Sequence, residues 1–289
     1  MEFYHLRSFV VVAETKNLTH AAKRLCSTPP AISAHIKSLE QELETPLFIR
    51  STKGMTLTDK GKLLLIKAQK TLDSAVDMVN LAAENQDELI GIFNLGINQN
   101  VQSLKCPRLI ENLSEICPGI SLQLKQSSSG KIIAGIQNEK LDGGYIYGDI
   151  PHGFTGIKVK TEAITAIAPK SFNRENITTL QDLAPLAWIT MGDYCPFDKV
   201  IKQKLGTRIC SKVQSDDDQS RLELVKSGIG LSLLERSIAE QEQLIGNVQI
   251  IPQLNFKMPV SFVVLTKRLN DPLIKAVRQE INILWDILI

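Results

Sequence analysis

The stretch "STPPAISAHIKSLEQELETPLFIRSTKGMTLT", residues 27–58, decides the fold of the first part of this chain. Apolar residues recur in it at helical spacing, at Ile32, Ile36, Leu39 and Leu43. Two prolines, Pro29 and Pro30, stand at the start of this pattern, and Thr28 before them can act as the N-cap residue. Prolines cost little in a first helical turn, because the N–H groups there have no helical partner and the fixed φ already suits a helix. We therefore predict a helix that begins stiffly at the two prolines.

Residues 47–58 read "LFIRSTKGMTLT", in which apolar and polar residues alternate on both sides of a turn that contains a glycine. This alternation predicts a β-hairpin with Arg50 and Lys53 near its tip. Two shorter helices are predicted upstream, from Leu6, Phe9, Val10 and Ala13 in the first, and from Ala21, Ala22 and Leu25 in the second. Three helices followed by a basic hairpin are typical of a winged helix-turn-helix domain, whose third helix enters the major groove of DNA.

Each part alone has a plainer interpretation, because three apolar helical patterns often form only a packed core, and basic residues on a hairpin are usually solvated surface. Their order along the chain is far more specific than any single part. We therefore predict that residues 1–58 form a domain that binds double-stranded DNA. The predicted DNA-binding residues are Thr28, Pro29, Pro30, Ser33, His35, Lys37, Arg50 and Lys53.

The segments "LRSFVVVAE", "LTHAAKRL", "PPAISAHIKSLEQEL" and "LFIRSTKGMTLTDKG" are together similar to the DNA-binding domain of the LysR-type transcriptional regulators. That family usually has a Gln and an Arg facing DNA where this chain has Pro29 and Ala34. Neither replacement has a side-chain hydrogen-bond donor, so direct readout of bases should be poorer than in the family. The other predicted contacts and the shape of the DNA would then contribute more.

Residues 59–89 predict one long helix, which Thr58 can cap and which would be roughly 45 Å long at about 1.5 Å per residue. A seven-residue repeat predicts a dimerisation seam along it, formed by Leu65, Ala68, Leu72, Ala75, Val79 and Ala82. Such a stripe is often only the packed face of a helix, but the length and the polar residues around it favour pairing. The resemblance agrees, because the family pairs its DNA-binding domains through this helix. It also implies a homotetramer, whereas the seam alone supports only a homodimer.

Residues 91–289 alternate short apolar runs with helical stretches, an order that predicts an α/β domain with parallel, doubly wound sheets. We divide this domain into a first subdomain, about residues 91–162 with 266–289, and a second, about residues 163–265. The segments "CPGISLQLKQ", "NEKLDGG" and "VKSGIGLSLL" are similar to the effector domain of the LysR-type regulators. The resemblance implies a periplasmic-binding-protein-like fold that holds a small-molecule effector between two subdomains.

Ligands of such folds bind at the carboxyl ends of the strands. The predicted effector-binding residues are Asn98, Asn100, Gln102, Ser127, Ser128, Ser129, Tyr147, Thr190, Phe197 and Asp216. Asn100 and Gln102 are expected at a helix amino terminus, where free N–H groups favour an anion or a carboxylate. Asn and Ser are also common in ordinary turns, so these positions could have no role beyond turn formation. No arginine is expected in these loops, which favours a small, weakly charged effector.

Two other functions are weighed against an effector-responsive regulator. Cys195 lies in "GDYCPF", near where peroxide-sensing members of the family place a reactive cysteine, so the sensor could be a thiol. The nearby Asp193 and Asp198 oppose a thiolate, and a structural or incidental thiol is therefore favoured. An enzyme on the same scaffold has little support, because the chain lacks a nucleophile elbow, a phosphate loop, a dinucleotide fingerprint and a His–carboxylate pair at zincin spacing.

Composition limits the remaining possibilities. A net charge of +2 over 289 residues is too small to indicate DNA binding by itself, so any basic surface must be local. Five scattered cysteines and four histidines without metal-ligand spacing predict reduced thiols, no metal and no cofactor. The sequence shows neither a signal peptide nor an apolar run long enough for a membrane span, so we expect a cytoplasmic protein without a membrane partner. RNA polymerase is a further candidate partner.

Overall fold

The structure is a computed structural model that describes residues 1–289 apart from 52–53, 84, 176, 193–194, 207–208 and 288–289. The chain divides into two compact units, residues 1–84 and 85–289, which are described separately below. Among the described residues, no helix is both long and apolar enough to cross a membrane.

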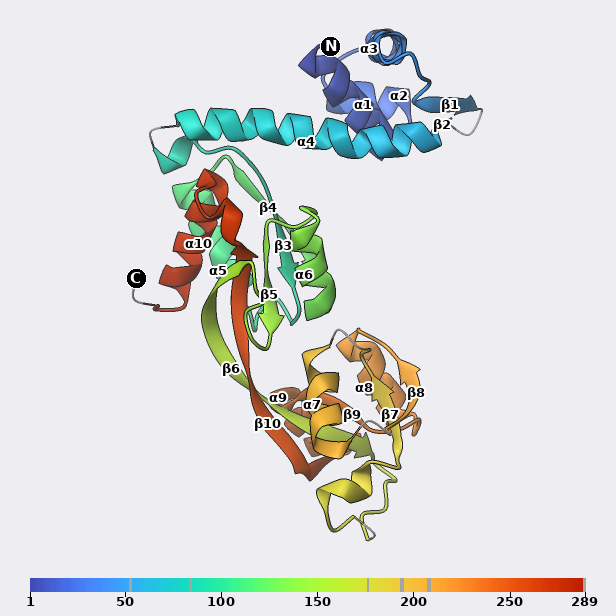
Figure 1. The fold of residues 1–289 in the computed structure, drawn as a ribbon, viewed down its shortest axis with the longest axis vertical. Helices are drawn as coiled ribbons and strands as arrows, with labels where there is room; N and C mark the ends of the chain where they lie inside the picture. Colours follow the sequence, from blue (N-terminus) through green and yellow to red (C-terminus); the bar gives the residue numbers. More distant parts are fainter. Residues whose placement is uncertain (52–53, 84, 176, 193–194, 207–208, 288–289) are drawn as a thin grey trace. The chain divides into compact units, whose positions relative to one another are not determined.

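The first unit is a winged helix-turn-helix domain followed by a long helix (Figure 1). Its elements are α1 (Phe3–Thr15), α2 (Leu18–Arg24), α3 (Pro29–Glu42), β1 (Phe48–Ser51), β2 (Gly54–Leu57) and α4 (Asp59–Ala82). The two strands pair in antiparallel register, with Phe48 opposite Leu57. Phe9, Ile36 and Leu39 lie in its core.

Side chains cap the start of three of these helices, and two of these caps, Thr28 and Thr58, are predicted from the sequence. The Asn17 Oδ1 accepts from the N–H groups of Thr19 and His20 at the start of α2. The Thr58 Oγ1 accepts from the Gly61 N–H at 2.9 Å, which caps α4. Helix α3 begins at Pro29 with Thr28 as its cap, so the expected double-proline start is confirmed.

The first half of the predicted dimerisation seam packs within its own domain. Ala68 is buried in the core of its own domain, and Leu65 and Leu72 pack against the same core. A seven-residue repeat also fits the face of a helix that covers a domain, and α4 uses these three residues for that purpose against α1. Ala75 is half-buried, whereas Val79 and Ala82, nearer the end of α4, are exposed. The helix ends at Ala82, and a short 3₁₀ turn, Gln86–Glu88, follows.

The second unit is a mixed α/β domain with one sheet of six strands and a smaller sheet of two. Its strands are β3 (Gly91–Ile97), β4 (Ile120–Gln126), β5 (Gly143–Tyr147), β6 (Phe154–Pro169), β7 (Ala187–Thr190), β8 (Cys210–Gln214), β9 (Ser232–Glu235) and β10 (Val248–Leu265). Its helices are α5 (Cys106–Ile116), α6 (Ser129–Gln137), α7 (Pro196–Leu205), α8 (Asp218–Lys226), α9 (Arg236–Leu244) and α10 (Pro272–Leu284), with 3₁₀ turns at Leu180–Leu183 and Thr266–Arg268.

The order in the large sheet is β4-β3-β5-β10-β6-β9, and the first three of these strands are parallel. Strand β10 runs antiparallel to both β5 and β6, and β6 runs antiparallel to β9. The two long strands β6 and β10 lie side by side and continue from one half of the unit into the other (Figure 1). The α/β class is thus confirmed, and the hydrogen-bonded ladder of the first half extends into the second through these two strands.

Parallel strands of the first half end at one edge of the sheet, where Ile97 pairs with Gln126. The residues just after these ends are therefore neighbours in space although they are some 30 positions apart in the sequence. In the second half, β7 and β8 form a parallel pair around the fully buried Trp188, whose indole N–H donates to the Leu183 carbonyl at 2.9 Å. These two edges carry the loops that form the site described next.

Candidate functional site

Two regions match the predicted functional residues: the surface around α3 in the first unit and a cavity in the second. At the start of α3, Thr28, Pro29 and Pro30 are exposed, and the Thr28 Oγ1 accepts from the Ala31 N–H at 3.4 Å. Lys37 is exposed two turns further along the same helix. The turn of the hairpin, to which Lys53 belongs, lies outside the described residues.

The hairpin and α3 meet through one pair of predicted residues. The guanidinium of Arg50, on β1, donates from Nη1 to the Ser33 Oγ of α3 at 3.3 Å. Arg50 is exposed, so the charge of its side chain can also reach a phosphate. The structure therefore brings the hairpin cation and the middle of α3 onto one continuous surface.

His35 is tied to α1 rather than extended into solvent. Its Nδ1 lies 2.9 Å from the Ser8 Oγ, and its ring lies 4.9 Å from that of Tyr4 and 5.4 Å from that of His5, centroid to centroid. Partial burial, together with the neighbouring His5, lowers the pKa of His35. The imidazole therefore carries less positive charge at neutral pH than an ordinary histidine, and it adds little phosphate-directed charge to α3.

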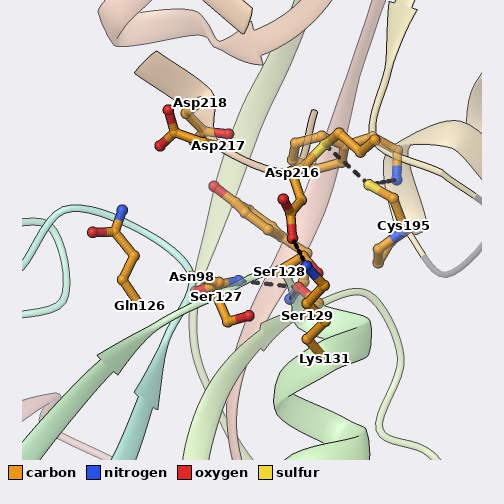
Figure 2. Close-up of a pocket in the computed structure, with 14 residues that line it drawn as sticks. Asn98, Gln126, Ser127, Ser128, Ser129, Lys131, Cys195, Asp216, Asp217 and Asp218 are labelled. Carbon is orange, nitrogen blue, oxygen red and sulfur yellow. Dashed lines mark hydrogen bonds and ion pairs between the residues drawn. The ribbon is translucent and has the colours of Figure 1, made fainter. Parts of the chain in front are cut away.

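A cavity of about 280 Å³ lies between the two halves of the second unit (Figure 2). The first half lines it with Asn98, Gln126, Ser127, Ser128, Ser129, Lys131 and Tyr147. The second half lines it with Met191, Cys195, Pro196, Phe197, Asp216, Asp217 and Asp218. Seven of the ten predicted effector-binding residues are therefore brought together here: Asn98, Ser127, Ser128, Ser129, Tyr147, Phe197 and Asp216.

The other three predicted residues lie elsewhere. Asn100 and Gln102 are exposed in a turn, where the Asn100 Oδ1 accepts from the Gln102 N–H at 2.8 Å. Helix α5 begins only at Cys106, because Pro107 fits the first turn, so neither residue stands at a helix amino terminus. Thr190 bonds to Ser211 at 2.8 Å and lines a smaller cavity, about 100 Å³, within the second half.

One ion pair crosses the larger cavity. The Lys131 Nζ, in the first turn of α6, lies 2.5 Å from the Asp216 Oδ2, in the loop before α8 (Figure 2). This bond with Lys131 lowers the pKa of the Asp216 carboxyl, which favours its ionised form. No arginine is among the described residues that line the cavity, but Lys131, which was not among the predicted residues, places a cation there.

A buried polar cluster lies behind the cavity wall and also joins the two halves. The Tyr147 Oη donates to the Glu235 Oε1 at 2.6 Å, and the Gln99 Nε2 donates to the same oxygen at 2.5 Å. Gln99 also contacts the Tyr147 hydroxyl. Burial raises the pKa of Glu235 above its ordinary value, and burial with the adjacent carboxyl raises that of Tyr147.

Sequence reasoning missed several of these residues. Gln99 stands between two predicted residues just after β3 ends, and its side chain bonds to Glu235, which is 136 positions later. Asp217 was not among the predicted residues; it caps α8 by accepting from the Ser220 N–H at 2.7 Å, and it also lines the cavity. A sequence signal for Lys131 exists, because it is the third residue after Ser128 and so lies in the first turn of the following helix.

Cys195 lines the cavity as well, and it is buried. Its Sγ donates to the Met191 Sδ at 3.1 Å and accepts from the Phe197 N–H at 3.3 Å. Burial raises the pKa of this thiol to about 11, so the reactive thiolate is scarce at neutral pH.

Comparison with known proteins finds a family match for each of the two units. A family model described as bacterial regulatory helix-turn-helix protein, lysR family, matches residues 3–62, and the LysR substrate binding domain matches residues 86–284. The chain is 28% identical over 253 residues to the HTH-type transcriptional regulator CzcR of Bacillus anthracis, which covers 86% of this chain and 85% of that protein.

Two solved structures show the same fold. The probable transcriptional regulator PA0477 from Pseudomonas aeruginosa superposes with a TM-score of 0.73 at 17% identity, covering 97% of this chain and 96% of that one. CbnR, a LysR family transcriptional regulator, superposes with a TM-score of 0.64 at 19% identity, covering 99% of each chain. With family models matched over both units, this chain belongs to the LysR family and is a DNA-binding transcriptional regulator with an effector-binding domain.

Proposed function

We propose that this regulator answers to a small molecule that binds in the cavity between the two halves of residues 85–289. The observation that carries the proposal is the composition of that cavity, in which polar side chains from both halves converge on one space. A ligand that contacts both walls has a different affinity for the open and the closed arrangement of the halves. It therefore shifts the equilibrium between them, which is the condition for control of DNA binding.

The DNA-binding surface proposed here is the exposed start of α3 together with the hairpin. Its support is the bond from Arg50 to Ser33 and the exposure of the residues around it. Base readout would come from Thr28 and Ser33, and phosphate contact from Lys37 and Arg50. Two chains would pair to bind two half-sites, as expected for helix-turn-helix dimers.

Selection of bound duplexes from a random DNA pool, with the full chain, tests this function. We expect a two-part motif to be enriched, and Arg50→Ala to weaken binding to all sequences and to lower its salt dependence. Arg236→Ala, which removes an exposed arginine of the second unit, is the matched control. Enrichment of no sequence at all would contradict the proposal.

Redox sensing through Cys195 is the weaker alternative. The position of Cys195 on the cavity wall favours redox sensing, whereas the buried environment and the raised pKa of the thiol oppose it.

A further inference from the structure

We propose that the ligand of the cavity is a zwitterion of the α-amino-acid type, whose two charged groups replace the Lys131–Asp216 ion pair. The proposal rests on the function proposed above and names the chemical class of the effector. Its basis is the opposite charge of the two cavity walls, which is set out below.

The wall from the first half is electropositive. It holds the Lys131 ammonium and the amino terminus of α6, a nine-residue helix. Ser128 is the N-cap residue of this helix, but its side chain makes no capping hydrogen bond. The first-turn N–H groups therefore receive no oxygen from Ser128, and together with the Ser127 and Ser128 hydroxyls they suit a carboxylate.

The wall from the second half is electronegative. Three consecutive carboxylates, Asp216, Asp217 and Asp218, line it. Asp217 is engaged as the cap of α8, and Asp218 pairs with the buried Arg221 at 2.6 Å. Asp216 is thus the carboxylate whose only ion-pair partner among the described residues is Lys131 across the cavity.

An amide group on the wall of the first half has unused hydrogen-bonding capacity. The Asn98 Nδ2 donates to the Ser129 Oγ at 3.3 Å, while the Asn98 Oδ1 is buried and has no hydrogen-bond partner among the described residues. A buried acceptor without a donor is costly, so a bound group with N–H donors would be favoured at this point. An ammonium supplies such donors, and a carboxylate supplies none.

These features fit one exchange of partners. The ligand carboxylate pairs with Lys131 and accepts hydrogen bonds from N–H groups at the start of α6. The ligand ammonium pairs with Asp216 and donates a hydrogen bond to the Asn98 Oδ1. A carboxylate alone would pair with Lys131 but leave Asp216 without a cation, and an amine alone would leave Lys131 without an anion. Discrimination against a ligand that lacks one charged group arises because the protein group it should meet is left unpaired. Tyr147 and Phe197, whose rings lie 4.7 Å apart, would form an aromatic wall against the side chain of the ligand.

The test measures ligand affinity of the full chain by titration calorimetry. The probes are the common L-amino acids, each compared with the carboxylic acid that lacks its amino group and with the amine that lacks its carboxyl group. We expect at least one amino acid to bind on the order of tenfold more tightly than both of its analogues, because each analogue loses a charged hydrogen bond. Binding of none of the amino acids, or equal binding of an amino acid and its carboxylic acid, would overturn the proposal.

Substitutions in the cavity test which protein group binds the ammonium of the ligand and which binds its carboxylate. Asp216→Asn should weaken binding of the amino acid on the order of tenfold, whereas binding of its carboxylic-acid analogue should not weaken, because the substitution removes the carboxylate that this analogue leaves unpaired. Lys131→Gln should weaken binding of the amino acid and of the carboxylic acid but not binding of the amine. Lys267→Gln breaks a comparable ion pair, 2.8 Å from Glu139 and remote from the cavity, and should change none of these affinities. If Asp216→Asn and Lys267→Gln have the same effect, the proposed role of Asp216 is wrong.

Failure of this inference differs from failure of the proposed function. A protein that selects a DNA motif and responds to carboxylic acids alone would keep the function and overturn the zwitterion. A protein that binds amino acids but enriches no DNA would overturn the function instead.

Discussion

At the scale of single residues, the carboxyl of Glu235 gives the second unit a measurable dependence on pH. Burial raises its pKa in the folded state above the ordinary value of 4.5. A raised carboxyl pKa means that the folded state holds its proton more tightly than the unfolded state. The stability from this group is therefore complete below the unfolded pKa and is lost as the pH rises through the folded pKa.

We expect the free energy of unfolding of wild-type protein to fall, relative to Glu235→Gln, as the pH is raised from about 4 toward 7. Glutamine keeps an oxygen for Tyr147 and Gln99 but has no proton to lose. Both tryptophans, Trp188 and Trp285, lie in residues 85–289, so denaturation followed by tryptophan fluorescence reports on this unit. Glu115→Gln, at an exposed position of α5, is the control. If the free energy of unfolding of Glu235→Gln changes with pH in parallel with that of the wild type, the pH dependence does not come from Glu235.

The reactivity of the Cys195 thiol is a second property that can be measured for a single residue. With a pKa of about 11, roughly one thiol in a thousand is ionised at pH 8, so alkylation by iodoacetamide should be slow. Cys26 and Cys210 are exposed and should react first. Peptide-resolved mass spectrometry distinguishes the sites, and modification of Cys195 as fast as that of Cys210 would revive the redox alternative.

At the scale of elements, α4 carries apolar side chains on a face that its own domain leaves uncovered. Leu63 and Ile66 are exposed, and so are Met78 and Leu81, at 69% and 70% of their surface. Three of the predicted seam residues instead belong to the packed face described above. We therefore predict that self-association uses the uncovered face of α4 rather than the whole predicted seam.

The replacement of Met78 and Leu81 by glutamate should weaken self-association, because a charge in an apolar interface is costly to desolvate. Sedimentation equilibrium of the full chain measures the effect, which we expect to exceed tenfold in the dissociation constant for the pair, or about 1.4 kcal/mol. Gln69→Glu, on another exposed part of α4, should have little effect. Unchanged association of the double variant would show that the uncovered face is not the interface.

Elements whose signals lie within a few residues could be predicted from sequence. The α3 start depends on Thr28 and the two prolines after it, and the structure has both features. The length of β10 could not be predicted, because Pro252 and Pro259 lie inside it and proline normally interrupts a strand. The structure accommodates Pro252 where the register with β6 shifts, between Ile251 and Asn255, and this irregularity depends on a partner strand far away in the sequence.

In the candidate site, too, only features whose signals lie within a few residues of the sequence could be predicted. Residues just after strand ends, such as Asn98 and Ser128, could be placed because parallel strands end at one edge. The Lys131–Asp216 pair could not, since its members are 85 positions apart and meet only through the packing of two halves.

At the scale of the whole molecule, the two units differ in how much of the chain each needs. Helix α10, near the end of the sequence, packs into the first half of the second unit through Ile274, Val277 and Ile281. It also bonds to the beginning of that unit, where the Gln86 Nε2 donates to the Gln279 Oε1 at 3.1 Å and the Lys105 Nζ donates to the Leu284 carbonyl at 3.0 Å.

Deletion of residues 272–289 should therefore unfold the second unit and leave the first unit folded. Hydrogen exchange with peptide resolution measures both in one experiment: protection should be lost over residues 91–265 and kept in α1 and α3. Lys275→Ala, at an exposed position of α10, should leave protection unchanged. Retained protection across β6 and β10 in the truncated chain would contradict this expectation.

The late position of β10 also sets an order of events on the ribosome. The first unit is complete after 84 residues, whereas the central strand of the second unit ends only at Leu265. At bacterial elongation rates of about 5–20 residues per second, that difference corresponds to roughly 10–40 s. During this interval a nascent chain has a finished DNA-binding domain but no finished sensor. Newly made protein could thus reach DNA close to its own gene before it can answer to any ligand.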